Sequence, residues 1–196
     1  MKKIYIREKT LIQDSFKLAV MIFNSRFRPD FLVGIWRGGS TVGIYVQECL
    51  QFLGVQTDHI SIRTSYQGEP DYRERVAKGH KIRAHGLQYL LENLNYNQKL
   101  LIVDDVYGSG SSINAVINQL SERLKKNMPS DYKIAVPWYK PSQNKSGRIP
   151  DFYVNQTNDW LVLPYELVGL NPNEIKNNKP QVNEILKSVR GNIKQN

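Results

Sequence analysis

The chain has 196 residues, of which 27 are basic and 18 acidic, so its formal net charge is +9. A chain of this length can bury a core unaided, and with Cys49 as its one cysteine it excludes a disulfide scaffold and a zinc site built on paired cysteines. The lone thiol favours a reducing cytoplasm. The longest apolar runs, 18–23 and 31–36, are too short to span a membrane. The positive charge indicates anionic partners, either nucleic acid or small phosphorylated molecules.

Alternating helices and short strands are predicted along most of the chain. Apolar residues at helical spacing predict a first helix that begins with a capping box at Thr10 and ends at Asn24. The apolar runs 31–36 and 99–103 are typical of strands buried in a parallel sheet. The alternation predicts an α/β fold with a mainly parallel central sheet flanked by helices. Further helices are predicted at 42–53, 85–94 and 113–124, and further strands at 57–62, 132–138, 151–154 and 160–163.

Two segments depart from this pattern. Residues 63–83 are charged, contain two glycines and a proline, and are predicted to form a long loop, of the kind that is either a functional lid or disordered. From Asn171 the composition shifts to Asn, Lys and Gln, with one weakly amphipathic piece at 182–189 that predicts a short terminal helix. We therefore expect a domain over residues 1–170 and a basic C-terminal tail over 171–196, with packing or dimer contact as the role of the tail.

Two glycine-rich turns follow predicted strands and precede predicted helices. They are Arg37-Gly38-Gly39-Ser40 and Tyr107-Gly108-Ser109-Gly110-Ser111-Ser112. Glycines let a backbone approach a ligand, and the free N–H groups of a helix N-terminus bind anions, most naturally phosphates. Because such turns lie at the carboxyl ends of strands, they indicate a ligand with two phosphate groups. The P-loop pattern is absent, and Ile113 stands where the dinucleotide fingerprint needs a third glycine.

Two adjacent carboxylates, Asp104 and Asp105, come directly before the second turn. Next to a phosphate cradle they would repel the ligand unless they address sugar hydroxyls or a divalent cation. A sugar phosphate bound with magnesium satisfies both conditions. The alternative, in which the pair only caps the following turn and helix, needs fewer carboxylates than the sequence provides.

The segment from Leu100 to Ser112 resembles the signature of the type I phosphoribosyltransferases: four apolar residues, an acidic pair, two apolar residues, and a small residue before Thr/Ser-Gly-x-Thr/Ser. The resemblance implies that Asp104 and Asp105 contact the ribose hydroxyls of phosphoribosyl pyrophosphate (PRPP) and hold Mg²⁺. It also implies that residues 33–39 bind the pyrophosphate, with Arg37 acting on the leaving group. The PRPP-binding residues implied in this way are Gly38, Gly39, Gly108, Ser109, Gly110, Ser111 and Ser112, with Ser65 and Tyr66 in a flexible catalytic loop.

The C-terminal third is similar to the hypoxanthine, guanine and xanthine phosphoribosyltransferases. The resemblance implies a small base-binding hood formed from terminal segments, with Lys140 donating to the purine oxo group, Trp160 and Leu161 against the ring, and Glu166 closing the site. One position departs from the family, because Gly108 stands where an aspartate usually exchanges a proton with the imidazole nitrogen of the purine. Three alternatives stay open: another group or water exchanges this proton, the substrate arrives already deprotonated, or the acceptor is a different base.

These features predict a magnesium-dependent phosphoribosyltransferase of nucleotide salvage, which joins hypoxanthine, guanine or xanthine to PRPP and releases pyrophosphate. We expect a cytoplasmic homo-oligomer, a dimer, with no membrane association. Two alternatives stay open. Gly108 is compatible with a pyrimidine or another nitrogen nucleophile as acceptor, and the charge of +9 permits a PRPP-binding regulatory protein that binds RNA on the same fold. Nucleic acid is the less favoured partner, because basic charge also suits a doubly phosphorylated substrate.

Overall fold

The computed structural model describes residues 2–66 and 82–188, which belong to two compact units. The larger unit is the single stretch Lys9–Asn158, and the smaller unit combines Met1–Glu8 with Asp159–Asn196. One unit is therefore uninterrupted in sequence, whereas the other joins the two terminal segments. No helix in the described ranges is long and apolar enough to cross a bilayer.

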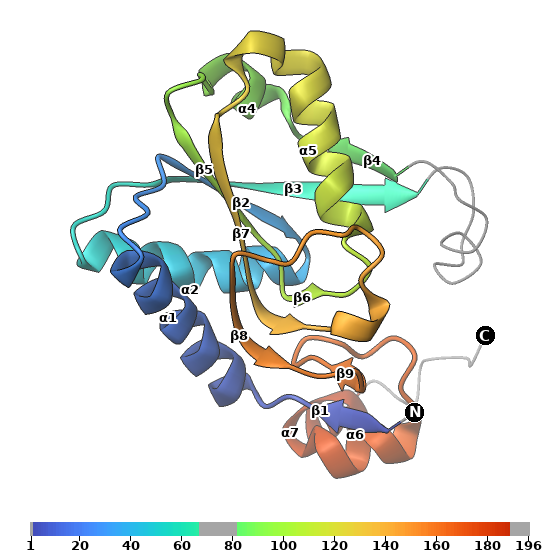
Figure 1. The fold of residues 1–196 in the computed structure, drawn as a ribbon. Helices are drawn as coiled ribbons and strands as arrows, with labels where there is room; N and C mark the ends of the chain where they lie inside the picture. Colours follow the sequence, from blue (N-terminus) through green and yellow to red (C-terminus); the bar gives the residue numbers. More distant parts are fainter. Residues whose placement is uncertain (1, 67–81, 189–196) are drawn as a thin grey trace. The chain divides into compact units, whose positions relative to one another are not determined.

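The larger unit is built on a seven-stranded sheet (Figure 1). Its strand order is β4-β3-β2-β5-β7-β6, and β8 also pairs with β7. Every pairing is parallel except that of β3 with β4, so the predicted α/β class with a mainly parallel sheet is confirmed. The strands are β2 (Phe31–Trp36), β3 (Asp58–Tyr66), β4 (Ile82–His85), β5 (Lys99–Val103), β6 (Val106–Tyr107), β7 (Asp131–Tyr139) and β8 (Phe152–Gln156).

The helices of the larger unit follow the predicted order, with two corrections. The first helix begins at Glu8, so Thr10 lies inside its first turn and the predicted capping box is wrong. Glu8 suits that turn because a carboxylate is favoured at the positive end of a helix dipole. The third helix is shorter than predicted, because His85 belongs to β4. The helices are α1 (Glu8–Asn24), α2 (Gly38–Phe52), α4 (Gln88–Asn93) and α5 (Ser111–Leu124), with short 3-10 helices η1 (Lys125–Asn127) and η2 (Pro141–Gln143).

Helices cover the sheet on both faces, which explains why its central strands are apolar without alternation. On one face, Val33 of β2 and Ile102 of β5 belong to a buried cluster with Val116 of α5. On the other face, Leu32 lies against α2, since a Cβ built on Gly43 would approach its Cδ2 atom to 3.1 Å. Figure 1 shows α2 and α5 on opposite faces of the sheet.

The end of β3 and the whole of β4 lie within residues 63–85, most of which were predicted to form a loop. The two strands pair antiparallel from Arg63 opposite His85 to Tyr66 opposite Ile82. The prediction of a loop over 63–83 is therefore wrong at both of its ends. The sequence did not predict β4, because this strand has no strong apolar pattern of its own and is defined by its pairing with β3. The residues between them, 67–81, lie outside the described ranges.

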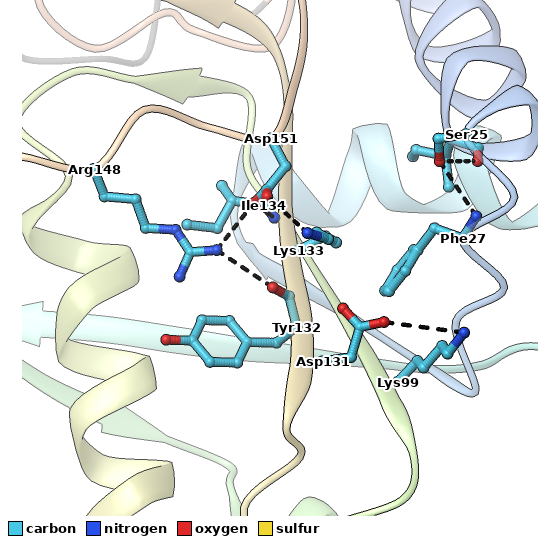
Figure 2. Close-up of polar contacts among 10 residues, drawn as sticks. Ser25, Phe27, Lys99, Asp131, Tyr132, Lys133, Ile134, Arg148 and Asp151 are labelled. Atoms are coloured by element: carbon cyan, nitrogen blue, oxygen red, sulfur yellow. Dashed lines mark hydrogen bonds and ion pairs between the residues drawn. The ribbon is translucent and has the colours of Figure 1, made fainter.

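Paired charged side chains lie at the amino ends of the central strands β5 and β7 (Figure 2). The Asp151 carboxylate accepts hydrogen bonds from the backbone N–H of Ile134 at 2.9 Å and from the Arg148 guanidinium at 3.0 Å. It also lies 3.3 Å from the Lys133 ammonium, and Lys99 pairs more loosely with Asp131 at 3.9 Å. Lys99, Asp131, Lys133 and Asp151 also line a cavity of about 470 Å³. The contacts of Asp151 hold the segment between η2 and β8 against β7.

The smaller unit contains a two-stranded parallel sheet and two short helices. Its sheet pairs β1 (Lys3–Tyr5) with β9 (Trp160–Val162) in the register Lys3 opposite Trp160. The helices are α6 (Pro172–Asn178) and α7 (Pro180–Lys187). The predicted helix near 182–189 is thus present with shifted bounds, and the predicted hood of terminal segments is confirmed as a substructure. Its role in binding a base stays a prediction.

The sequence analysis missed α6, although its start carries a recognisable signal. The Asn171 side chain accepts from the backbone N–H of Glu174, and the Glu174 side chain accepts from the backbone N–H of Asn171, both at 2.9 Å. This reciprocal pair is a capping box, and Pro172 occupies the first helical position, where its fixed backbone angle fits. The sequence Asn171-Pro172-Asn173-Glu174 therefore contained the evidence for a helix.

Glu174 also joins the C-terminal segment to β1. Its Oε1 atom accepts hydrogen bonds from the Lys3 ammonium at 2.5 Å and from the Tyr5 hydroxyl at 3.0 Å. The hydrogen bond from Lys3, with that from the Asn171 backbone, lowers the pKa of Glu174 from 4.5 to about 2. A carboxylate with a lowered pKa stabilises the folded state above its unfolded pKa and loses that contribution as the pH falls towards its folded pKa.

Replacing Glu174 with glutamine should therefore destabilise the protein at neutral pH and have less effect in acid. We expect the difference in thermal midpoint between the wild type and Glu174→Gln to shrink steadily below pH 4.5, towards the folded pKa of about 2. The measurement is thermal unfolding from neutral pH to about pH 3, with exposed Glu122→Gln of α5 as the control. A difference that stays constant over this range would contradict the contribution assigned to Glu174.

Candidate active site

The two glycine-rich turns meet at the carboxyl edge of the parallel sheet. β2 and β5 are neighbours, with Gly34 opposite Val103, so the turns that follow them leave the sheet side by side. Gly39 sets their spacing, because a Cβ built on it would lie 2.3 Å from the Val103 carbonyl oxygen and 2.8 Å from the Cα of Asp104. Only a glycine permits this approach of backbone to backbone. The predicted pyrophosphate turn thus rests directly on the strand end that carries the acidic pair.

The first turn leads straight into α2. The peptide between Trp36 and Arg37 is cis, the Arg37 side chain is exposed, and no side chain caps the helix. Gly38, Gly39 and Ser40 are buried. The Ser40 hydroxyl has no hydrogen-bond partner among residues 2–66 and 82–188. A buried hydroxyl without a partner is costly in free energy.

The acidic pair occupies the turn between β5 and β6. The Asp104 carboxylate accepts from the backbone N–H of Asp105 at 3.0 Å, and the Asp105 carboxylate accepts from that of Val106 at 2.7 Å. Burial raises the pKa of Asp104 well above its usual range, and the negative charge of Asp105 raises it further. A nearby cation, or hydroxyl groups that donate hydrogen bonds to the carboxylates, would relieve this repulsion.

The second turn begins at Gly108 and runs into α5. Gly110 caps the helix with a φ of 76°, a left-handed conformation that favours glycine. A Cβ there would also lie 2.6 Å from the Tyr107 hydroxyl and 2.8 Å from Ser146. The hydroxyls of Ser109 and Ser111 lie 3.0 Å apart. The structure therefore brings Gly108, Ser109, Gly110, Ser111 and Ser112 together as one continuous turn at the start of a helix.

The segment after β7 supports this turn, and the sequence analysis did not identify it. The Lys145 backbone N–H donates to the Ser109 carbonyl at 3.2 Å, and the hydroxyls of Ser146 and Tyr107 lie 2.8 Å apart. The Asn144 side chain donates to the Tyr139 hydroxyl at 3.0 Å. These contacts join residues distant in sequence, so no local motif announces them. The turn is thus held from outside as well as by its own glycines.

Lys140 lies beside the second turn in the same unit. The pairing of β6 with β7 brings it there, and its backbone N–H donates to the Tyr107 carbonyl at 2.9 Å. Lys140 is only 8% exposed, which is unusual for a lysine. Gln143, at the end of η2, approaches the same turn, since a Cβ on Gly108 would lie 3.2 Å from its Oε1 atom. Lys140, Gln143 and Gly108 therefore form one cluster.

Three residues predicted to bind the base belong to the smaller unit. Trp160 is 40% exposed, whereas Leu161 is buried and pairs with Ile4 across the small sheet. Glu166 closes a turn with Leu163, whose backbone N–H donates to the Glu166 carboxylate at 2.9 Å. The Lys179 ammonium holds the same turn, because it donates to the carbonyl oxygens of Leu163 at 2.8 Å and Pro164 at 2.7 Å. The tail therefore supports the segment that carries Glu166.

Ser65 and Tyr66 are the last two residues of β3, where the backbone pairs with Arg83 and Ile82 of β4. They lie in a strand, whereas the sequence analysis placed them in a loop. Their role in binding PRPP stays a prediction.

The sequence matches the model of the phosphoribosyl transferase domain over residues 4–168. The chain belongs to the type I phosphoribosyltransferase family. Among solved structures, a purine phosphoribosyltransferase from Pyrococcus horikoshii Ot3 is similar, with 25% identity and a TM-score of 0.63 over 87% of this chain and 98% of that one. A xanthine-guanine-hypoxanthine phosphoribosyltransferase from Helicobacter pylori shares the fold at 19% identity, with a TM-score of 0.61 over 91% of this chain and 99% of that one.

A hypothetical protein from Neisseria gonorrhoeae with bound ppGpp has the same phosphoribosyltransferase fold, at 18% identity and a TM-score of 0.64 over 94% of this chain and 97% of that one. No curated protein matches the chain. Family membership confirms the resemblance of residues 100–112. The individual roles of the acidic pair, the two turns and the base-binding residues stay predictions.

Proposed function

We propose that this chain is a PRPP-dependent phosphoribosyltransferase that transfers the phosphoribosyl group to an oxopurine and releases pyrophosphate, in nucleotide salvage. The observation that carries the proposal is the contact of Gly39 with Val103 and Asp104. That contact sets a turn suited to pyrophosphate beside an acidic pair suited to ribose, with a phosphate cradle on the next turn of the same edge. PRPP has these three groups in this order.

Catalysis in this proposal rests on positioning and electrostatics. Asp104 and Asp105 hold the ribose hydroxyls, and the turn from Gly108 to Ser112 fixes the 5′-phosphate. Arg37 and the backbone N–H groups of Gly38 and Gly39 stabilise the negative charge that develops on the departing pyrophosphate. Ser65 and Tyr66 complete the PRPP site. The buried, unpaired hydroxyl of Ser40 supports a ligand at the first turn.

The acidic pair also fits a magnesium ion. Two adjacent carboxylates with a raised pKa at Asp104 are relieved by a cation, and Mg²⁺ is commonly bound by one or two carboxylates together with substrate phosphates. Within the described ranges, no group of three or more His, Cys, Asp or Glu side chains is placed to hold a metal alone. Oxygen atoms of PRPP would supply the remaining ligands. When bound, the ion neutralises charge on the pyrophosphate.

The residues to which this proposal gives base recognition are those expected from the sequence: Lys140, Trp160, Leu161 and Glu166. Lys140 supports this assignment because a buried lysine, held by its backbone to the residue before the turn from Gly108 to Ser112, suits an electron-rich carbonyl oxygen. Similar folds in proteins named as purine phosphoribosyltransferases support an oxopurine over a pyrimidine as acceptor.

The test is pyrophosphate release from PRPP and Mg²⁺ with hypoxanthine, guanine, xanthine, adenine, uracil or orotate supplied separately. We expect release that depends on an oxopurine and on Mg²⁺. Release only with uracil or orotate would replace the oxopurine by a pyrimidine acceptor. Binding of PRPP without release in the presence of any base would replace the enzyme by a regulatory protein on the same fold.

A further inference from the structure

Gly108 is glycine for a different reason from Gly110. Its backbone is not in the left-handed region, and the one atom that a Cβ would meet is Oε1 of Gln143, at 3.2 Å. The conformation of the turn therefore does not require a glycine at this position. What the missing side chain provides is room, and the amide of Gln143 occupies part of that room.

The backbone around Gln143 is fixed on both sides. The Gln143 N–H donates to the Lys140 carbonyl at 3.1 Å, and the Ser142 N–H donates to the Asn158 side chain at 3.1 Å. On the other side, the Asn144 side chain donates to the Arg148 carbonyl at 2.9 Å and to the Tyr139 hydroxyl. Gln143 is therefore held in place beside the first residue of the phosphate turn.

The amide of Gln143 itself is unused. Across residues 2–66 and 82–188 its side chain makes no hydrogen bond, although it is half-buried. An amide can donate and accept hydrogen bonds, but unlike a carboxylate it cannot take a proton near neutral pH. The Gln143 side chain, half-buried beside Gly108 and without a hydrogen bond to the described residues, is therefore available to a ligand in that cluster.

We propose that Gln143 accepts a hydrogen bond from the imidazole N–H of the acceptor purine and thereby selects a purine that carries negative charge on its own ring. This inference rests on the proposed function. As the ring nitrogen bonds to C1′ of the ribose, positive charge develops on the imidazole. A carboxylate would offset that charge, whereas a neutral amide does not, so the acceptor must offset it. Xanthine, with two oxo groups, ionises more readily than hypoxanthine or guanine.

The step balances without a protein base. The lone pair of the ring nitrogen forms the bond to C1′, and the bond from C1′ to the pyrophosphate oxygen breaks with its electron pair leaving on pyrophosphate. The imidazole N–H proton passes to water while Gln143 holds the ring by a hydrogen bond.

The test compares kcat/KM for xanthine and hypoxanthine at one pH. The wild type should prefer xanthine by about tenfold or more. Gln143→Glu should reverse or abolish this preference. The new carboxylate repels an anionic base, and when the base is neutral it offsets the positive charge that develops on the imidazole. Gln143→Leu should lower kcat for both bases by about tenfold with unchanged PRPP binding. Gln98→Glu is the matched control, since it adds the same charge at a distant turn and keeps the oxygen that accepts from the Asn95 N–H.

The possible outcomes separate the two proposals. An active wild type whose ratio of xanthine to hypoxanthine is unchanged by Gln143→Glu would overturn the role of Gln143 and leave the phosphoribosyltransferase in place. A wild type that prefers hypoxanthine would do the same. A wild type that releases no pyrophosphate with any base would overturn both proposals. If Gln143→Glu fails to fold, Gln143→Leu decides, because a merely structural role would leave kcat unchanged in the folded fraction.

Discussion

Replacing Asp105 with asparagine should lower turnover by about a hundredfold to a thousandfold, because it removes a charge from the place where we propose that the ribose and its cation bind. The fold should change little. Asparagine keeps the side-chain oxygen that accepts from the Val106 N–H, which lies 2.7 Å away in the wild type. It also relieves the repulsion between the carboxylates of Asp104 and Asp105. We expect the free energy of unfolding to stay within about 1 kcal/mol of the wild type.

The measurement pairs steady-state pyrophosphate release with denaturant unfolding of the same preparation. Asp131→Asn is the matched control, because it makes the same chemical change at the opposite edge of the sheet, in the loose pair with Lys99. Turnover of Asp105→Asn equal to that of the wild type would remove the assigned role of the acidic pair.

Replacing Gly39 with alanine should damage both stability and activity. The added methyl group would lie 2.3 Å from the Val103 carbonyl oxygen and 2.8 Å from the Cα of Asp104, and both of these are backbone atoms that cannot rotate away. Overpacking of this kind costs about 1–3 kcal/mol or more. The first turn must also move away from the acidic pair, and a displacement of about 1 Å at a reacting centre can reduce turnover about a hundredfold.

Gly108→Ala separates the effect of the clash from the general cost of replacing a glycine. Its Cβ would meet only the flexible tip of Gln143, at 3.2 Å, so its free energy of unfolding should stay close to that of the wild type. Denaturant unfolding of the two variants makes the comparison. If Gly39→Ala were as stable as Gly108→Ala, the close contact between the first turn and β5 would not exist in solution.

The parts of the fold that sequence could predict are those whose signal is local. β2 and β5 were predicted with correct bounds, because a strand buried on both faces is a continuous apolar run. The glycine-rich turns were found because glycines follow two predicted strands, and the structure requires Gly39 for close approach and Gly110 for its left-handed conformation. The acidic pair was found because two neighbouring carboxylates exceed what a helix cap needs.

The parts that sequence could not predict depend on distant partners. β1, β4 and β6 have two to four residues each and are defined by the strands beside them, not by a pattern of their own. Ser146 and Gln143 reach the turn from Gly108 to Ser112 through the path of the chain after β7, which no local motif encodes. The start of α1 was predicted wrongly because a local capping pattern is present at Thr10, although the helix begins at Glu8.

The pairing of β1 with β9 has a consequence for the order in which the molecule forms. Lys3 and Trp160 are partners, yet every residue of the larger unit is synthesised between them. At about 5–20 residues per second, β1 is synthesised roughly ten to thirty seconds before β9. Because every strand of the larger sheet precedes Trp160 in the chain, the small sheet cannot begin to form until all of those strands have been synthesised. The N-terminal strand therefore has no partner strand during most of the synthesis of the chain.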